Sequence, residues 1–119
     1  MKWKLDKNRP ICPQICEQLC AHIAAGEFLP KEKLMSVREM AVVTSVNPNT
    51  VQHAFAQLEA QGILYSERGS GWYIAADTQA AKDLCQTIAH QKISAFFEDM
   101  STLGLSAEEI QTMVKEWKT

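Results

Sequence analysis

One stretch of the chain decides its fold: SVREMAVVTSVNPNTVQHAFAQLEAQG, residues 36–62. Ser36 and Glu39 have the spacing of a capping box, in which each side chain bonds the backbone of the other residue, so a helix is expected to open at Ser36. After a turn of about four residues, Asn47 supplies a good cap and Pro48 suits the first position of a second helix. Two short helices joined by such a turn predict a helix-turn-helix.

The apolar residues indicate which face of each helix is buried. The first helix of the pair is expected to end near residue 43 and to turn four side chains inward: Val37, Met40, Ala41 and Val43. The second, which Gly62 is expected to end, has an inner face spaced by three and four residues: Val51, Ala54, Phe55 and Leu58. An earlier helix, residues 11–25, carries a stripe with a spacing of four: Ile11, Ile15, Leu19 and Ile23.

A β-hairpin is predicted directly after the helix-turn-helix. Residues 63–67 read as one strand and residues 72–75 as the returning strand. The turn between them, residues 68–71, is Arg-Gly-Ser-Gly, and its glycines are free to adopt positive φ. A hairpin at this point is a wing. The predicted fold class is mainly α with a small β-hairpin, a winged helix-turn-helix followed by a short two-helix tail.

The tail is predicted to contain one long and one short helix. The long helix runs from about residue 78 to residue 100, and a break at residues 103–105 follows it. Ser106 and Glu109 form a second capping box, which opens a last helix to about residue 117. Two such helices cannot bury all of their own apolar side chains, so five of these are expected to need a partner: Phe96, Phe97, Met100, Met113 and Trp117. The tail folding back on its own winged helix is the alternative.

Composition excludes several classes of protein. The 119 residues suit one small domain with an appendage, and 46% apolar residues are too many for a disordered chain. Because no apolar run approaches the roughly 18 residues of a membrane span, and no apolar core follows the basic residues of Met1–Lys7, we expect a cytoplasmic protein without a membrane partner. The net charge of −2 does not favour nucleic acid, so any DNA-facing charge must be local. Six residues are candidates: Lys2, Lys4, Lys7, Arg9, Arg38 and Arg68.

Three of the four cysteines recur every four residues on one predicted helix. On a helical wheel Cys12 lies with the apolar stripe, Cys16 at its edge and Cys20 further round. They are expected to be small core residues with one at the boundary, and metal or redox sensing is the alternative. No metal, cofactor or catalytic residue is predicted, since the sequence has no nucleophilic triad, phosphate-binding glycine loop or evident pair of carboxylates. We therefore do not expect an enzyme.

Six motifs in fixed order resemble the DNA-binding domain of the GntR family: residues 10–15, 25–30, 33–41, 46–51, 58–63 and 68–71. The resemblance covers about residues 8–76 and implies a winged helix-turn-helix DNA-binding domain there. The tail, residues 77–119, resembles the YtrA subfamily, whose members carry a two-helix dimerisation tail in place of a large effector domain and often lie near transporter genes. The family usually has an aromatic residue, a glycine and a proline where this chain has Cys12, Lys31 and Met35. Lys31 is expected to shift the loop before the helix-turn-helix.

The expected DNA contacts combine helix geometry with this resemblance. A recognition helix enters the major groove by its N-terminal end, where Asn and Gln can read adenine, Thr can contact a thymine methyl or a phosphate, and free backbone N–H groups can bind phosphate. The resemblance adds an arginine of the preceding helix, and the wing adds its tip. The predicted DNA-binding residues are Ser36, Arg38, Asn47, Asn49, Thr50, Gln52, Arg68 and Gly69.

Several of these residues also have an alternative role that involves no contact with DNA. Arg38 could pair with Glu39 or Glu59, Asn47 could serve only as a cap, and Arg68 could be a solvated turn residue. Gln52 and His53 are adjacent and cannot both face bases, so Gln52 is favoured.

The predicted function is that of a sequence-specific transcription regulator. We expect a repressor that binds double-stranded operator DNA, acting as a homodimer on a palindromic site, with transporter genes as possible targets and the effector left open. The alternative is a winged helix that binds other proteins without contacting DNA.

Overall fold

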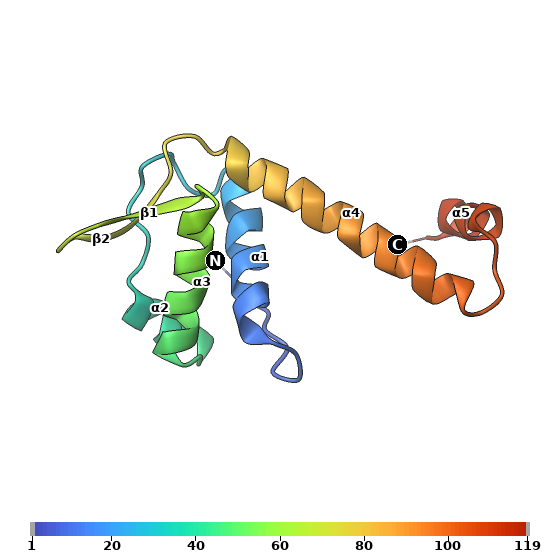
Figure 1. Cartoon of the computed structure of the whole chain (residues 1–119), viewed down its shortest axis with the longest axis horizontal. Coiled ribbons are helices and arrows are strands. Elements are labelled where there is room, and N and C mark those ends of the chain that lie inside the picture. Colours follow the sequence, from blue (N-terminus) through green and yellow to red (C-terminus); the bar gives the residue numbers. More distant parts are fainter. Residues whose placement is uncertain (1, 119) are drawn as a thin grey trace. The chain divides into compact units, whose positions relative to one another are not determined.

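The computed structural model describes residues 2–118, so Met1 of the N-terminal segment and Thr119 of the predicted tail lie outside the described residues. Its elements are five helices and one hairpin (Figure 1): α1 (Ile11–Ala24), α2 (Val37–Thr44), α3 (Pro48–Ala60), β1 (Leu64–Glu67), β2 (Gly71–Ile74), α4 (Gln79–Ser101) and α5 (Ala107–Glu116). The predicted fold class, mainly α with a small hairpin, is confirmed. Each predicted element is present with bounds that differ by about one residue.

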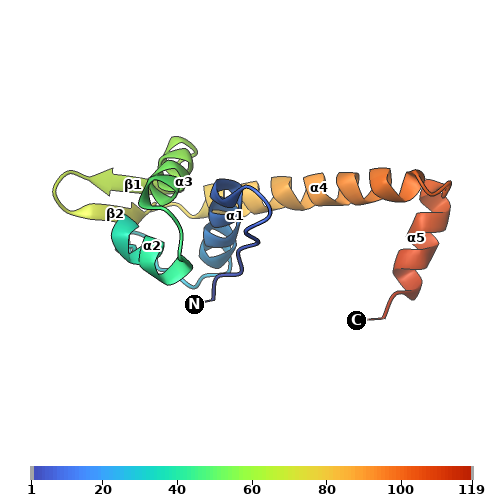
Figure 2. The ribbon, with the colours of Figure 1, turned by 90° about the horizontal axis from the view of Figure 1, so that it is seen from below.

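The contacts divide the chain into two compact units. The first runs to Cys85 and the second begins at Gln86, so α4 contributes its first turns to one unit and the remainder to the other. Within the first unit α3 is the central element, because it packs against α1, α2 and β1. Figures 1 and 2 both show α1 on one side of α3, with α2 and the hairpin toward the other.

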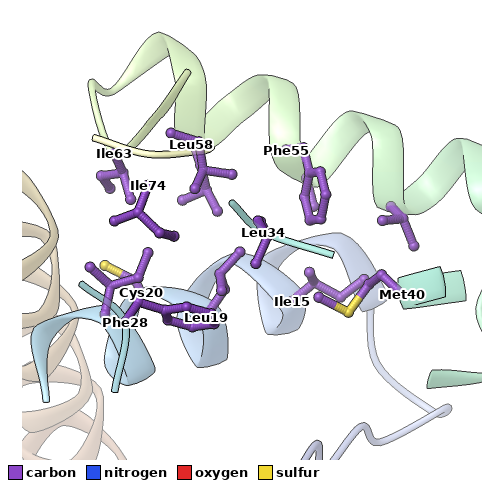
Figure 3. Close-up of a cluster of buried hydrophobic side chains, with 14 of the residues drawn as sticks. Ile15, Leu19, Cys20, Phe28, Leu34, Met40, Phe55, Leu58, Ile63 and Ile74 are labelled. Atoms are coloured by element: carbon purple, nitrogen blue, oxygen red, sulfur yellow. The ribbon is translucent and has the colours of Figure 1, made fainter. Parts of the chain in front are cut away.

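The core of the first unit joins α1 to α3 (Figure 3). The α1 stripe is buried as predicted at Ile15, Leu19 and Ile23, and it faces fully buried Phe55 and Leu58 of α3. Removing one such side chain costs about 2–5 kcal/mol of folding free energy, so this interface dominates the stability of the unit.

The predicted order of burial among the cysteines of α1 is wrong. Cys20 is fully buried, whereas Cys12 and Cys16 are half-buried. The reason is tertiary: Ala81 and Cys85 at the start of α4 pack against the core, and the Cys20 thiol donates to Ala81 O at 3.0 Å. A helical wheel of α1 alone cannot reveal this cover.

The C-terminal end of α2 differs in one detail from the expected pattern. Val43, predicted to face inward, is 59% exposed, and Thr44 is buried in its place. Met40 and Thr44 are four residues apart and share a helix face, while Val43 lies beyond its edge. Thr44 tolerates burial because its hydroxyl donates to Met40 O at 2.6 Å.

The second unit consists of the remainder of α4 and of α5. Ser106 and Glu109 form the predicted capping box, with the Glu109 N–H donating to Ser106 Oγ at 3.1 Å. Ile110 is the buried apolar residue of α5. Between residues 2 and 118 no helix is both long enough and apolar enough to cross a membrane.

The segment before α2 hydrogen-bonds to the outer edge of β2 and forms one isolated bridge there, between Lys33 and Tyr73. Lys31 N–H donates to Ile74 O at 3.0 Å, Ile74 N–H donates to Glu32 O at 2.9 Å, and Leu34 N–H donates to Trp72 O at 2.9 Å. Lys31 adopts a left-handed backbone with φ of 67°. This conformation is costly for any residue with a Cβ, which accounts for the glycine that the GntR resemblance implies at this position.

Replacing Lys31 with glycine is expected to raise the free energy of unfolding by about 0.5–1 kcal/mol, because glycine adopts positive φ without the steric cost of a Cβ. Urea denaturation followed by circular dichroism measures the change. Lys31→Ala is the matched control, since it removes the charge and keeps the Cβ, and its stability should stay close to wild type. Equal stabilisation of both variants would mean that the lysine head group, rather than the backbone, carries the cost.

Candidate nucleic-acid interface

The N-terminal end of α2 presents Arg38 on a capped helix. Ser36 and Glu39 form the predicted capping box: Glu39 N–H donates to Ser36 Oγ at 3.1 Å, and Ser36 N–H donates to Glu39 Oε1 at 3.2 Å. Arg38 is exposed, and within residues 2–118 it forms no ion pair. Neither of the two carboxylates considered as its partner bonds it, since Glu59 accepts from Ser66 N–H and Oγ instead. Its guanidinium is available to a ligand.

The N-terminal end of α3 is the expected reading end. Asn47 is indeed a cap, since its Oδ1 accepts from Asn49 N–H at 2.8 Å. The N–H groups of Thr50 and Val51 both donate to Asn47 O. Because Pro48 has no N–H, the first turn retains no free backbone donor for a phosphate, contrary to expectation. The groups of this first turn that remain available to a ligand are therefore side chains.

Three of those side chains are accessible. Asn49 and Gln52 are exposed and Thr50 is half-buried. His53, the alternative to Gln52, is exposed as well.

The wing carries Arg68 and Gly69 at its tip. The strands pair in an antiparallel register that aligns Leu64 with Ile74 and Glu67 with Gly71. Both tip residues are exposed, and Gly69 has φ of 77° with open space where a Cβ would lie. Other atoms can therefore approach the backbone of the tip closely.

Lys33 is a cation beside the wing that the predicted site does not include. It is exposed and pairs with Tyr73 in an isolated antiparallel bridge, and its Cε lies 3.5 Å from the position of a Cβ on Gly71. Tyr73 in turn stacks on Tyr65, with ring centroids 5.4 Å apart. The sequence motif includes Lys33 but gives no sign that this segment joins the hairpin edge, so its position was not predictable.

Lys7 and Arg9, two of the six candidate cations, have partners within the chain. Lys7 Nζ donates to Ser45 O at 2.9 Å and to Thr44 O at 3.3 Å, at the C-terminal end of α2. Arg9 Nε lies 3.1 Å from Asp6 Oδ2. The pKa of the Asp6 carboxyl is lowered, mainly because it accepts a hydrogen bond from the Asn8 N–H and also because Arg9 lies beside it. The charge of Lys7 therefore stabilises the turn of the helix-turn-helix, because a cation interacts favourably with the negative end of the α2 dipole.

Gln14 anchors the N-terminal segment that carries Lys7. Its buried amide donates to Asp6 O and to Pro10 O, both at 2.9 Å, and its Oε1 accepts from Asp6 N–H at 2.7 Å. With the amide bonded on both sides, the segment is held against α1 and Lys7 is directed to the turn.

The chain is similar in sequence and structure to known proteins of one family. Residues 13–74 match the family described as "Bacterial regulatory proteins, gntR family". The transcriptional repressor YtrA of Bacillus subtilis (strain 168) is 32% identical to this chain over 92% of its length and 85% of the relative's. A solved structure of a GntR family transcriptional regulator from Listeria monocytogenes has a TM-score of 0.82 and 38% identity, covering 96% of this chain and 100% of that one.

A solved complex with DNA is also similar. The DNA-binding domain of AraR bound to an operator has a TM-score of 0.53 and 27% identity, covering 63% of this chain and 94% of that one. Together these matches confirm the predicted resemblance and the winged helix-turn-helix. The relatives are regulators, a class that is generally not enzymatic.

Replacing Lys7 with methionine is expected to lower the free energy of unfolding by about 0.5–1 kcal/mol, because it removes a cation from the end of α2 and keeps the length of the side chain. Urea denaturation measures the loss. Lys4→Met removes a charge from the same segment, where only the Lys4 backbone bonds Gln18, and should have little effect. Similar losses in the two variants would contradict a specific role for Lys7 at the turn.

Proposed function

The chain belongs to the gntR family of bacterial regulatory proteins, and from this premise we propose that residues 8–76 bind operator DNA and that the chain represses transcription as a homodimer through residues 77–119. One observation carries the proposal: Arg38 and the polar side chains at the N-terminal end of α3 are exposed, and Arg38 has no ion-pair partner in residues 2–118. The name of the YtrA relative supports repression. Operator binding requires the predicted cytoplasmic location, where the chromosome lies.

Base reading is assigned to the first turns of α3. Asn49 and Gln52 can each bond adenine N6 and N7, and the Thr50 methyl or hydroxyl can contact a thymine methyl or a phosphate. Asn47 uses only its Oδ1 in the cap, so its amide N–H groups remain able to donate.

Arg38 and Ser36 are assigned to the entry of α2. Arg38 can bond guanine O6 and N7 or clamp a phosphate with two N–H groups. The Ser36 oxygen accepts within the capping box, and its hydroxyl hydrogen can still donate to a phosphate.

The wing is assigned to the phosphates or the adjacent minor groove. Arg68 supplies charge at the tip, Gly69 permits close backbone approach, and Lys33 adds a second cation at the base. These contacts set orientation rather than sequence preference.

Dimerisation is assigned to the second unit because of its exposed apolar surface. An apolar groove of about 500 Å³ is lined by Phe96, Met100, Met113, Val114 and Trp117. Trp117 is 76% exposed, an unusual state for so large a side chain. A second copy that covers this groove gives two-fold symmetry, and hence a palindromic operator with half-sites roughly 34 Å apart. The YtrA resemblance suggests transporter genes as targets.

A protein-binding winged helix without DNA contact is the alternative function. A gel shift of duplex DNA that weakens steeply with salt distinguishes the two, because release of counterions from phosphates accompanies only DNA binding. Selection from a randomised duplex library by the full chain supplies the probe. A library without any enriched sequence would favour the alternative.

Arg38→Ala is expected to weaken binding to the selected duplex by about 1–3 kcal/mol, which corresponds to roughly 5- to 150-fold in Kd. Fluorescence anisotropy at fixed salt measures the affinity. Lys82→Ala removes the same charge from an exposed position on α4 and should change Kd much less. If Arg38→Ala and Lys82→Ala weakened binding equally, Arg38 would contribute only general charge.

Val114→Glu is expected to dissociate the dimer, because it introduces a carboxylate into the apolar groove that the second copy would cover. Light scattering should change from twice the chain mass of 13.3 kDa to that mass at micromolar concentration. Ala107→Glu adds the same charge to the exposed first turn of α5 and should leave the dimer intact. A wild-type chain that is already monomeric would remove the dimer from the proposal.

A further inference from the structure

Cys20 and Cys85 bring two thiols into contact across two helices. Cys20 lies on α1 within the core cluster (Figure 3), and Cys85 lies on the first turns of α4. Their Sγ atoms are 3.7 Å apart, although the residues are 65 positions apart in the chain. Both belong to the first compact unit.

The other two thiols have a different environment. Cys12 and Cys16 both donate to Gln57 Oε1 of α3, at 3.7 Å and 3.6 Å, and Cys16 also donates to Ala54 O. Cys20 instead donates to Ala81 O at 3.0 Å, which turns its sulfur toward α4. No group of three metal-ligating side chains exists in residues 2–118, so a redox pair fits this site better than a metal cluster.

We propose that Cys20 and Cys85 form a redox site, in which a hydroperoxide oxidises the two thiols to a reversible disulfide that fixes the first turns of α4 to α1. A disulfide needs an S–S distance of about 2.05 Å, so the two sulfurs, now 3.7 Å apart, must approach each other by about 1.65 Å. The two sulfurs are already in van der Waals contact, so closing the bond does not require distant parts of the chain to meet.

The exposure of the two thiols assigns their roles. Cys85 is half-buried and reachable by a small peroxide, whereas Cys20 is fully buried. Burial raises the pKa of the Cys20 thiol to about 12, so this group stays protonated at neutral pH. Because the peroxide must reach the thiol that it oxidises, the more exposed Cys85 reacts first and the buried Cys20 resolves the product.

The chemistry balances with one molecule of hydroperoxide, ROOH. The Cys85 thiolate attacks the O–O bond and becomes a sulfenic acid, and the departing oxygen takes up the thiol proton as ROH. The Cys20 sulfur then attacks the Cys85 sulfur, the S–OH bond breaks, and hydroxide leaves with the Cys20 proton as water. The two sulfurs lose two electrons and the peroxide gains two. A small dithiol reverses the bond by thiol–disulfide exchange.

The test uses the full chain carrying Cys12→Ser and Cys16→Ser, in which the proposed pair holds the remaining thiols. After brief treatment with hydrogen peroxide, denatured protein should show loss of both maleimide-reactive thiols, loss of two hydrogens in intact mass, and recovery of both with dithiothreitol. The bridge closes a long loop, so the melting temperature should rise by about 10 °C. Two persistent thiols, disulfides only between chains on a non-reducing gel, or a lower melting temperature would each overturn the site.

Cys85→Ser in the same background is the matched control, since it changes the more exposed partner and leaves the core thiol in place. It should form no intramolecular disulfide and show no rise in melting temperature. Cys85→Ala serves the same purpose if the serine variant does not fold. A sulfenic acid trapped by dimedone on Cys85 of the Cys12→Ser and Cys16→Ser chain, without progress to a disulfide, would also overturn the pairing.

A coupling to DNA rests additionally on the proposed function. α4 continues as one helix of 23 residues from the site into the second unit, so fixing its first turns limits how a dimer can adjust to its half-sites. Oxidation should therefore weaken binding to the selected duplex by at least about threefold, reversibly, which is about 0.65 kcal/mol. A bridge that leaves this affinity unchanged would overturn the coupling alone, while a reduced chain that selects no duplex would overturn the proposed function and leave the redox site standing.

Discussion

The packing of α3 against α1 is the constraint on which the rest of the structure depends. Four buried side chains of α3 meet the buried stripe of α1: Val51, Ala54, Phe55 and Leu58. At 3.6 residues per turn, burying that stripe leaves the opposite face of α3 exposed, with Asn49 and Gln52 on it. The apolar core thus orients the polar end of the helix without any contact of its own to a ligand. The same core receives Met40 of α2, which gives α2 a fixed place beside α3.

Local signals made most of the fold predictable. The two capping boxes, the Asn47-Pro48 pair and the spacing of the apolar residues each act within a few residues, and each matched the structure except for the exposed Val43. Interactions between distant residues were not predictable. Lys7 contacts Ser45 across 38 positions, and the segment at Lys31 joins the outer edge of β2. Neither pairing leaves a periodic trace in the sequence, because each depends on where the core has already placed both partners.

The cysteines illustrate the same limit at a single helix face. The wheel of α1 ranked Cys12 as the most buried, since it lies with the apolar stripe. The start of α4 covers the other end of the helix, so Cys20 became the buried thiol and acquired Cys85 as a neighbour. For the candidate DNA site, the residues and roles predicted from the sequence stay predictions, while the structure shows which of the polar groups already have partners within the chain. The capped N–H groups of α3 and the paired Lys7 and Arg9 both reduce the donors available to phosphate.

The small number of donors available to phosphate suggests why a single chain would bind DNA too weakly for the proposed function. With Lys7 and Arg9 engaged internally, the cations that the proposal assigns to DNA are few: Arg38, Arg68 and Lys33. Each phosphate contact contributes to affinity through release of counterions, so a unit with few contacts binds any sequence weakly. Weak general binding favours discrimination between sequences, because most of the affinity then depends on base contacts, which the proposal assigns to Asn49 and Gln52. Two such units joined in one dimer regain affinity through effective concentration, since the second half-site is bound intramolecularly. In the proposed dimer, the apolar groove around Trp117 joins two units, each of which binds DNA weakly by itself because it offers few cations.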